Sequence, residues 1–162
     1  MAEVPPSSGR LIILCGLPGT GKTTLARGLE TQTNAVRLSA DEWMLDLRID
    51  LWDDAGRARL EALQEQLAQR LVEIGATVIV ESGGWSRAER DALHEAARAR
   101  GAAVELRYLD EPIDVLWGRV ERRNRQPQWV GREITRAHLE AWAKLIEVPT
   151  AGERATYDPP LH

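Results

Sequence analysis

The feature that most constrains this chain is a glycine-rich stretch, Gly16–Thr23 (GLPGTGKT), which follows a continuous apolar run at Arg10–Cys15. An apolar run of this length predicts a strand buried on both faces, as in a parallel sheet. The residues from Lys22 onward have a helical pattern. Glycines let backbone N–H groups converge on phosphate oxygens, and the start of a helix adds positive potential. The order of strand, G-x-x-x-x-G-K-[ST] loop and helix therefore predicts a phosphate-binding loop.

Two side chains of this loop carry predicted chemistry. Lys22 is expected to reach the outer phosphates of ATP, and the hydroxyl of Thr23 to hold Mg²⁺. Only Lys22 and Lys144 are lysines among 21 basic residues, so Lys22 marks a position where arginine will not serve. The candidate residues for binding ATP are Gly16, Leu17, Pro18, Gly19, Thr20, Gly21, Lys22, Thr23 and Thr24.

Strand and helix patterns alternate along the rest of the chain. Val36–Ser39, Thr77–Val80 and Val104–Leu109 are strand candidates, and helical patterns separate them. This alternation predicts βαβ units and an α/β fold, with four to five parallel strands and helices on both faces. Residues 1–162 are expected to form one domain, with an ordered core at about 10–147 and weakly ordered ends at 1–8 and 150–162.

Local signals predict where several helices begin and which face they bury. Apolar residues recur at three- and four-residue steps, the period of one helix face. This predicted face consists of Leu60, Leu63, Leu67, Leu71 and Ile74. Ser39 with Glu42, and Ser86 with Glu89, have the spacing of capping boxes that begin helices.

Composition excludes several classes of protein. Hydrophobic residues make up 43% of the chain and charged residues 28%, which is ordinary for a globular protein. No apolar run approaches the roughly 20 residues that span a bilayer, and Met1–Arg10 lacks the pattern of a signal peptide. The single cysteine, Cys15, predicts a buried thiol. We therefore expect a cytoplasmic protein without a membrane partner.

Two acidic residues follow predicted strands, at the edge of a parallel sheet where ligands bind. Asp41 is a candidate general base that takes the proton of an acceptor hydroxyl. Its alternative role is a helix cap or a favourable acid in the first helical turn. Glu81 is a candidate ligand for Mg²⁺, and its alternative is a solvated strand end.

The stretch Arg119–Arg125 (RVERRNR) contains four arginines in seven residues. Arginine suits phosphate oxygens, so these residues predict a lid that clamps the transferring group. The alternatives are a solvated helix face, or a nucleic-acid patch shared with Arg132 and Arg136. The formal net charge of −4 argues against the nucleic-acid patch.

The chain has six tryptophans and no phenylalanine. Four of them follow the predicted catalytic segments or lie near them, and are candidates for lining an acceptor pocket: Trp43, Trp52, Trp85 and Trp129. The alternative is simple packing. Trp117 and Trp142 lie within helical patterns and are expected in the core. His94, His138 and His162 show no spacing typical of a metal site or a catalytic triad and are expected on the surface.

Four motifs in this order, GLPGTGKTT, SADEW, VIVESGGW and RVERRN, resemble those of P-loop kinases of small acceptors. The pattern is most similar to the AAA-type ATP-binding proteins grouped with the kinase domain of phage polynucleotide kinase and with chloramphenicol phosphotransferase. The resemblance covers roughly residues 10–147. It implies a P-loop NTPase fold like that of nucleoside kinases, with an arginine-bearing lid.

The resemblance also implies roles for individual residues. Lys22 and Thr23 would hold ATP·Mg²⁺, and Asp41 would be the general base. Glu81 would take the place of the aspartate that ends the third strand. Arg119 would stack near adenine, and Arg123 would be the lid arginine.

Polynucleotide kinases of this type carry an arginine three residues after the catalytic aspartate, where this chain has Met44. The departure favours an uncharged acceptor, and Met44 is expected to help line its pocket. The sequence thus predicts an ATP- and Mg²⁺-dependent phosphotransferase acting on a hydroxyl of a small molecule, such as an antibiotic, a sugar or a nucleoside-like compound. The alternatives are a 5′-hydroxyl polynucleotide kinase and a nucleotide-binding regulator without transfer activity. The sequence leaves the oligomeric state open.

Overall fold

The computed structural model describes residues 9–81 and 84–161. Within them, four parallel strands form one sheet in the order β2-β3-β1-β4. Their bounds are β1 (Arg10–Cys15), β2 (Val36–Leu38), β3 (Thr77–Val80) and β4 (Ala103–Tyr108). This sheet confirms the predicted α/β fold. The predicted weak order of residues 1–8 lies outside the described residues.

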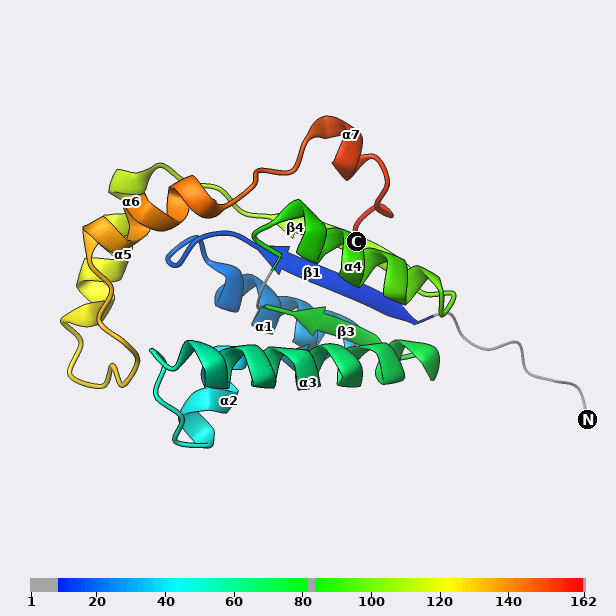
Figure 1. Ribbon diagram of the computed structural model, residues 1–162, viewed down its shortest axis with the longest axis horizontal. Coiled ribbons are helices and arrows are strands. Elements are labelled where there is room, and N and C mark those ends of the chain that lie inside the picture. The colour runs from blue at the N-terminus through cyan, green and yellow to red at the C-terminus, as the bar shows by residue number, and fades with distance from the viewer. Residues whose placement is uncertain (1–8, 82–83, 162) are drawn as a thin grey trace, which may run out of the picture.

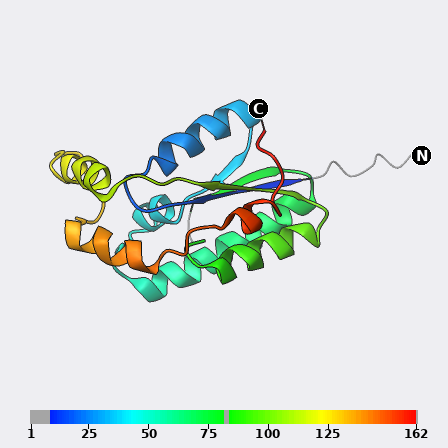
Figure 2. The ribbon, with the colours of Figure 1, turned by 90° about the horizontal axis from the view of Figure 1, so that it is seen from above.

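Helices cover both faces of the sheet because β1 sends alternate side chains to opposite sides. Leu11 and Ile13 pack in one cluster with residues of α3 (Asp54–Glu73) and α4 (Arg87–Arg98). Ile12 and Leu14 pack in a second cluster with residues of α1 (Lys22–Thr33). Figure 2 shows α1 on one side of the sheet and α3 and α4 on the other. The central strand is therefore buried on both faces, as its apolar run predicts.

The remaining helices gather around the carboxyl ends of the strands and the C-terminal segment. They are α2 (Ala40–Asp46), α5 (Ile113–Asn124), α6 (Arg136–Leu145) and the short α7 (Ala151–Arg154). In Figure 1 the arrows of β1 and β3 point toward the side on which α5 and α6 lie. Across residues 9–81 and 84–161, no helix is both long and apolar enough to cross a bilayer.

The buried face of α3 differs from the predicted one. Its inward residues are spaced mainly four apart: Gly56, Leu60, Gln64, Ala68 and Val72, with Gln69 beside them. Leu63, Leu67 and Ile74 are 61%, 39% and 73% exposed, so the prediction for them was wrong. Counting apolar residues failed here because a glycine, an alanine and a glutamine occupy the inward positions where the helix meets the sheet.

The predicted capping boxes form to different extents. Ser86 accepts a hydrogen bond from Glu89 N, and the Glu89 side chain accepts one from Ser86 N, so this box is confirmed. Ser39 accepts from Glu42 N at the start of α2, but the Glu42 carboxylate is bound by Arg37 instead. An ion pair has taken the place of the second capping bond.

Residues 150–161 are packed against the domain, in contrast to the weak order predicted for 150–162, of which residue 162 lies outside the described residues. Glu153 of α7 is almost fully buried and pairs with Arg90 of α4, with a distance of 2.6 Å from Nε to Oε1. Arg90 is itself completely buried and also donates to Gly84 O and Trp85 O. The arginine holds the tail to the segment that precedes α4. The order of this polar segment could not be predicted from its sequence, because the partner of Glu153 lies 63 residues away.

This buried pair makes a prediction about stability. Glu153→Gln leaves the charge of Arg90 buried without a counter-charge, and we expect the free energy of unfolding to fall by about 3 kcal/mol. The exposed pair of Arg70 and Glu73 supplies the control, because Glu73→Gln should change it by less than about 1 kcal/mol. Urea unfolding followed by circular dichroism measures both. Equal stabilities of the two variants would contradict the role given to Glu153.

Candidate active site

The phosphate-binding loop depends on glycines because other parts of the chain approach it closely. A Cβ atom on Gly16 would lie 2.6 Å from Leu109 O, which no side chain tolerates. Gly19 has a φ of +86°, and a Cβ there would lie 3.1 Å from Val120 of α5. The loop therefore keeps its shape only with glycine at these two positions.

The start of α1 is built to receive an anion. Its N-cap residue is Gly21, which has no side chain to satisfy the first N–H groups of the helix. Lys22 Nζ folds back onto the loop and donates to Gly16 O at 2.5 Å and Leu17 O at 3.1 Å. Free N–H groups and a lysine beside a helix N-terminus form an anion site of the kind that binds nucleotide phosphates.

Lys22 is coupled electrostatically to the other predicted catalytic residues. Burial of its ammonium is the main cause that lowers the pKa of Lys22 to about 8, and the positive charge of Arg123 acts in the same direction. The charges of Cys15, Asp41 and Glu81 oppose this shift in the pKa. Asp41, Glu81 and Arg123 therefore all act electrostatically on the loop lysine.

Glu81 lies next to the loop threonine. Its Oε2 accepts a hydrogen bond from Thr23 Oγ1 at 3.4 Å, and its Oε1 accepts one from Arg37 at 2.9 Å. Arg37 also binds Glu30 and Glu42. Burial of Arg37 tends to lower its pKa, but hydrogen bonds to Glu42 and Glu81 raise it above the usual value. A permanently charged arginine therefore orients Glu81, and the pair of Glu81 and Thr23 offers the oxygen donors that Mg²⁺ prefers.

Asp41 is an exposed carboxylate in the first turn of α2. The helix cap is Ser39, so the cap role considered for Asp41 belongs to another residue. Arg57 of α3 donates from Nη2 to Asp41 Oδ1 at 2.7 Å and also lies 3.7 Å from Glu61. Arg57 fixes the direction in which the Asp41 carboxylate points. The sequence carried no local signal for this contact, because 16 residues separate the two.

The helices α5 and α6 and the connection between them form the predicted lid, which packs on the loop. Leu17 belongs to one apolar cluster with Leu116 and Val120 of α5 and Leu139 of α6. Arg119 donates to Gly19 O at 3.0 Å and pairs with Glu111. The predicted adenine role of Arg119 remains a proposal, and its observed contact is with the loop backbone.

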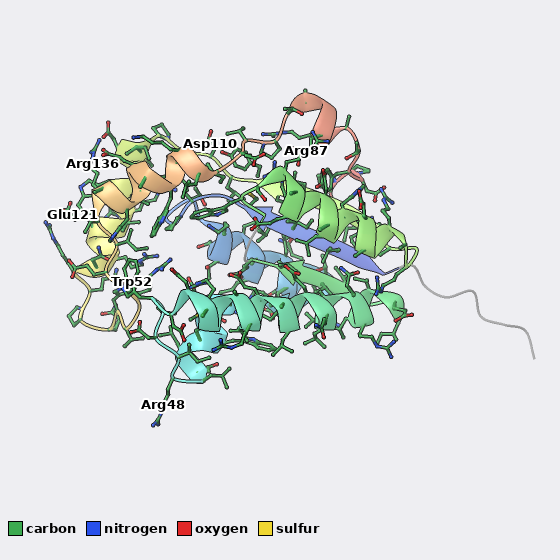
Figure 3. The ribbon with its side chains drawn as sticks, viewed as in Figure 1. Arg48, Trp52, Arg87, Asp110, Glu121 and Arg136 are labelled. Atoms are coloured by element: carbon green, nitrogen blue, oxygen red, sulfur yellow. The ribbon has the colours of Figure 1, made fainter. Side chains whose placement is uncertain are left out.

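The arginines of the lid have different surroundings. Arg123 lies with its guanidinium 4.1 Å from the ring centre of Trp129. Arg122 is exposed, and Arg136 pairs with Asp114 and Glu140. In Figure 3 the labelled Arg136 and Glu121 lie along the outer edge of the lid. Arg123 is thus the arginine of this cluster that is coupled to Lys22.

An aromatic row connects the lid to the loop between α2 and α3. The rings of Trp52, His138 and Trp142 follow one another with centroid distances of 5.1 Å and 5.5 Å, and Trp85 lies 6.0 Å from Trp142. Arg132 lies over Trp52 at 4.5 Å and over Trp142 at 5.1 Å. Figure 3 shows Trp52 between the start of α3 and the lid. Trp142, expected in the core, and His138, expected on the surface, both belong to this row.

The other two candidates for the acceptor wall pack inward. Met44 has no exposed surface and lies in a cluster with Ala40, Leu51 and Leu60. Trp43 is half-buried against the same cluster. Met44 therefore cannot line a pocket, and its identity says nothing about the charge of an acceptor.

Two of the hollows on the described surface bear on the acceptor pocket. The larger, about 470 Å³, lies between α3 and α4 and contains none of the predicted site residues. The smaller, about 350 Å³, lies where the α2–α3 connection meets the lid, and Trp52 and Arg132 help to line it. Only the second hollow adjoins the aromatic row.

These features define a P-loop protein with a lid. The family model of the AAA domain matches residues 11–149, and the chain belongs to this family. The matched span includes the loop, both predicted acids and the lid arginines. It confirms the resemblance drawn from the four motifs. No curated protein matches the chain in sequence.

Solved structures with similar folds include two named as kinases. A putative kinase from Chloroflexus aurantiacus J-10-fl is 26% identical, with a TM-score of 0.69, and the match covers 88% of this chain and 82% of that one. A gluconokinase from Sinorhizobium meliloti 1021 is 20% identical, with a TM-score of 0.62 and coverages of 91% and 80%.

A third similar structure comes from the Pnkp1/Rnl/Hen1 RNA repair complex. It is 23% identical with a TM-score of 0.72, and the match covers 96% of this chain but 48% of the other. The present chain therefore spans about half the length of that protein. Together the three structures support the P-loop kinase fold, and they differ in the compounds that their names suggest.

The lowered pKa of Lys22 makes a prediction about nucleotide binding. Phosphate favours the charged ammonium, so binding at about pH 9 should take up close to one proton, and affinity should fall as the pH rises above about 8. Calorimetry in two buffers with different ionisation heats measures this uptake. Lys22→Met is the control because its side chain cannot take up a proton, so only protons exchanged by the nucleotide remain. Equal uptake in both proteins would contradict the prediction.

Proposed function

We propose that this protein is an ATP- and Mg²⁺-dependent kinase that transfers the γ-phosphate to a hydroxyl of a small molecule. The observation that carries the proposal is the arrangement at the loop, where Lys22 lies on the glycine-rich turn, Thr23 and Glu81 face each other, and the lid helix α5 contacts the loop through Arg119. Phosphoryl transfer uses such a set, because a lysine and a metal site bind the phosphates while lid cations neutralise the transferring group.

Each residue of the site has a separate role in the proposed reaction. Asp41 takes the hydroxyl proton as the acceptor oxygen attacks the γ-phosphorus. A bond forms between that oxygen and phosphorus, the bond from phosphorus to the bridging oxygen of ADP breaks, and the proton passes from Asp41 to solvent. Lys22 binds the outer phosphates, and Arg123, held against Trp129, neutralises charge on the transferring phosphoryl group.

Thr23 and Glu81 are the residues that would hold Mg²⁺ together with phosphate oxygens. The hydroxyl and the carboxylate already face each other, and Arg37 holds the second oxygen of Glu81. When bound, Mg²⁺ supplies positive charge beside the phosphate oxygens. Arg37 then acts as a positioning residue, since it keeps the Glu81 carboxylate directed at Thr23.

Two alternatives remain, and each has an observation of its own. Similarity to a protein of an RNA repair complex favours a 5′-hydroxyl polynucleotide kinase. Against it, Arg119, Arg125 and Arg136 of the lid form ion pairs with carboxylates of this chain. A nucleotide-binding regulator would keep the loop and hydrolyse ATP slowly, at a rate that no acceptor changes.

Mass spectrometry of a pooled reaction tests the proposal directly. The protein is mixed with ATP, Mg²⁺, sugars, sugar acids, nucleosides, amphenicols, aminoglycosides and a 5′-hydroxyl oligonucleotide. A mass gain of one phosphate on a small compound is the expected result, and Lys22→Ala should abolish it. Phosphate on the oligonucleotide alone would favour the polynucleotide kinase, while hydrolysis unaffected by the pool would favour the regulator.

The role of Asp41 predicts a separation of catalysis from nucleotide binding. Asp41→Asn should lower kcat by about a hundredfold or more and leave the Kd of ATP within about twofold. Asp46→Asn, at the exposed end of the same helix, is the matched control and should leave both values unchanged. A large loss of ATP affinity in Asp41→Asn would assign this residue to the nucleotide site instead.

A further inference from the structure

The partly or fully buried arginines fall into two groups. Most are paired with carboxylates, and these are Arg10, Arg37, Arg57, Arg90 and Arg107. Arg123 and Arg132 are also partly buried, yet neither forms an ion pair within residues 9–81 and 84–161. Because a desolvated charge is costly without a partner, the exception indicates that both arginines serve an anion from outside the chain.

Arg132 is held firmly although it has no counter-charge in the part of the chain that the structure describes. Its guanidinium lies over Trp52 and Trp142, and its Nη1 donates to Leu51 O at 3.2 Å. Aromatic rings stack on the flat faces of a guanidinium, so its edges, which carry the N–H donors, stay available for hydrogen bonds. The described residues use one of its five N–H groups, so Arg132 presents a rigid set of donors.

Arg57 brings a third guanidinium to the same region, although its Nη2 already pairs with Asp41 at 2.7 Å. Arg132 reaches this region through its hydrogen bond to Leu51 O, since Leu51 packs with Ala40, next to Asp41, and with Leu60, three residues after Arg57. Burial lowers the pKa of Arg132, and the charge of Arg57 acts in the same direction. The Nε of Arg57 is buried and has no hydrogen-bond partner in the described part of the chain, and the same holds for the Nε of Arg123. Asp41 acts on both Arg123 and Arg132. Arg57 therefore contacts the carboxylate of the proposed base, and Arg123 and Arg132 interact with it electrostatically.

We propose that Arg57 and Arg132 form an anion subsite for the acceptor, which is a small hydroxyl compound carrying a carboxylate or a phosphate group. Arg123 serves the transferring phosphoryl group, and the other two hold the acceptor's own anion beside Asp41. This inference rests on the proposed kinase function and names the class of its substrate. It replaces the expectation of an uncharged acceptor, which depended on Met44.

A small anion fits the described surface better than a nucleic acid does. Nucleic-acid binding needs a track of unpaired cations along the backbone of the polymer. Among the described lid arginines, Arg119, Arg125 and Arg136 pair with carboxylates of the chain, and Arg122 is the one exposed arginine without an ion pair. The described lid therefore does not present a continuous track of unpaired cations.

Binding measurements test the subsite without relying on catalysis. The loop is first saturated with Mg²⁺ and a non-hydrolysable ATP analogue, so that added anions do not bind there. Calorimetry then compares matched pairs: gluconate with glucose, and glycerol 3-phosphate with glycerol. We expect the anionic member of at least one pair to bind about tenfold more tightly, since each ionic hydrogen bond contributes about this factor. Equal affinities within both pairs, or no saturable anion binding, would overturn the subsite.

Matched variants locate the binding. Arg57→Gln and Arg132→Gln should each weaken binding of the anion about tenfold. Arg59→Gln, exposed on the same helix as Arg57, and Arg122→Gln, exposed on the lid, change the net charge equally and should leave it unchanged. Urea unfolding confirms that each variant is folded. Equal losses in all four variants would attribute the effect to overall charge and overturn the assignment.

A kinetic arm separates this inference from the proposed function. With any acceptor found by mass spectrometry, Arg132→Gln should raise KM about tenfold or more and change kcat much less. Anion binding without phosphoryl transfer to any compound would remove the kinase proposal and leave the subsite. Transfer to a neutral acceptor with unchanged KM in both variants would keep the kinase and overturn the subsite.

Discussion

Packing of α5 on the phosphate-binding loop is the contact on which the arrangement of the site depends. Leu17 of the loop belongs to the apolar cluster of the lid. Gly19 has no side chain at the point where Val120 approaches the loop. Arg119 adds a hydrogen bond to the loop backbone. Burial of apolar surface is strong and non-directional, so it is sufficient to place α5 on the loop without a contribution from ion pairs. The position of Arg123 relative to Lys22 then follows from the helical spacing along α5.

Ion pairs between elements set the direction of the two acids. Arg37 of β2 holds Glu81, and Arg57 of α3 holds Asp41. In each case a guanidinium from a neighbouring element orients a carboxylate that the proposed chemistry uses. The buried pair of Arg90 and Glu153 has a related effect at a distance, because Arg90 also binds the backbone at Gly84 and Trp85, just before α4. The C-terminal segment thereby helps to fix the chain after β3.

Features that depend on neighbours in sequence were predictable. The strand, loop and helix around Gly16–Thr23 follow from burial and from glycine geometry, and the capping box of Ser86 and Glu89 follows from a three-residue spacing. Contacts between distant segments were not. The tail around Glu153 looks polar and loosely ordered until its partner is known, and His138 has no recognisable spacing, although it lies between two tryptophans.

The acceptor side of the site shows most clearly why the charge of the acceptor could not be predicted from the sequence. An argument from the third residue after Asp41 assumes that the acceptor's charge is met by α2, but Met44 points into the core. In the proposed subsite the positive charge comes from Arg57 of α3 and from Arg132 of the lid. Arg57 lies three residues before Leu60 and seven before Gln64, on the inward side that α3 presents to the domain. Arg57 adjoins the buried face that Gly56, Gln64 and Ala68 form, and from there its guanidinium contacts Asp41. The charge that the proposed subsite offers to an acceptor therefore depends on how α3 and the lid pack, and tertiary contacts are needed to infer it.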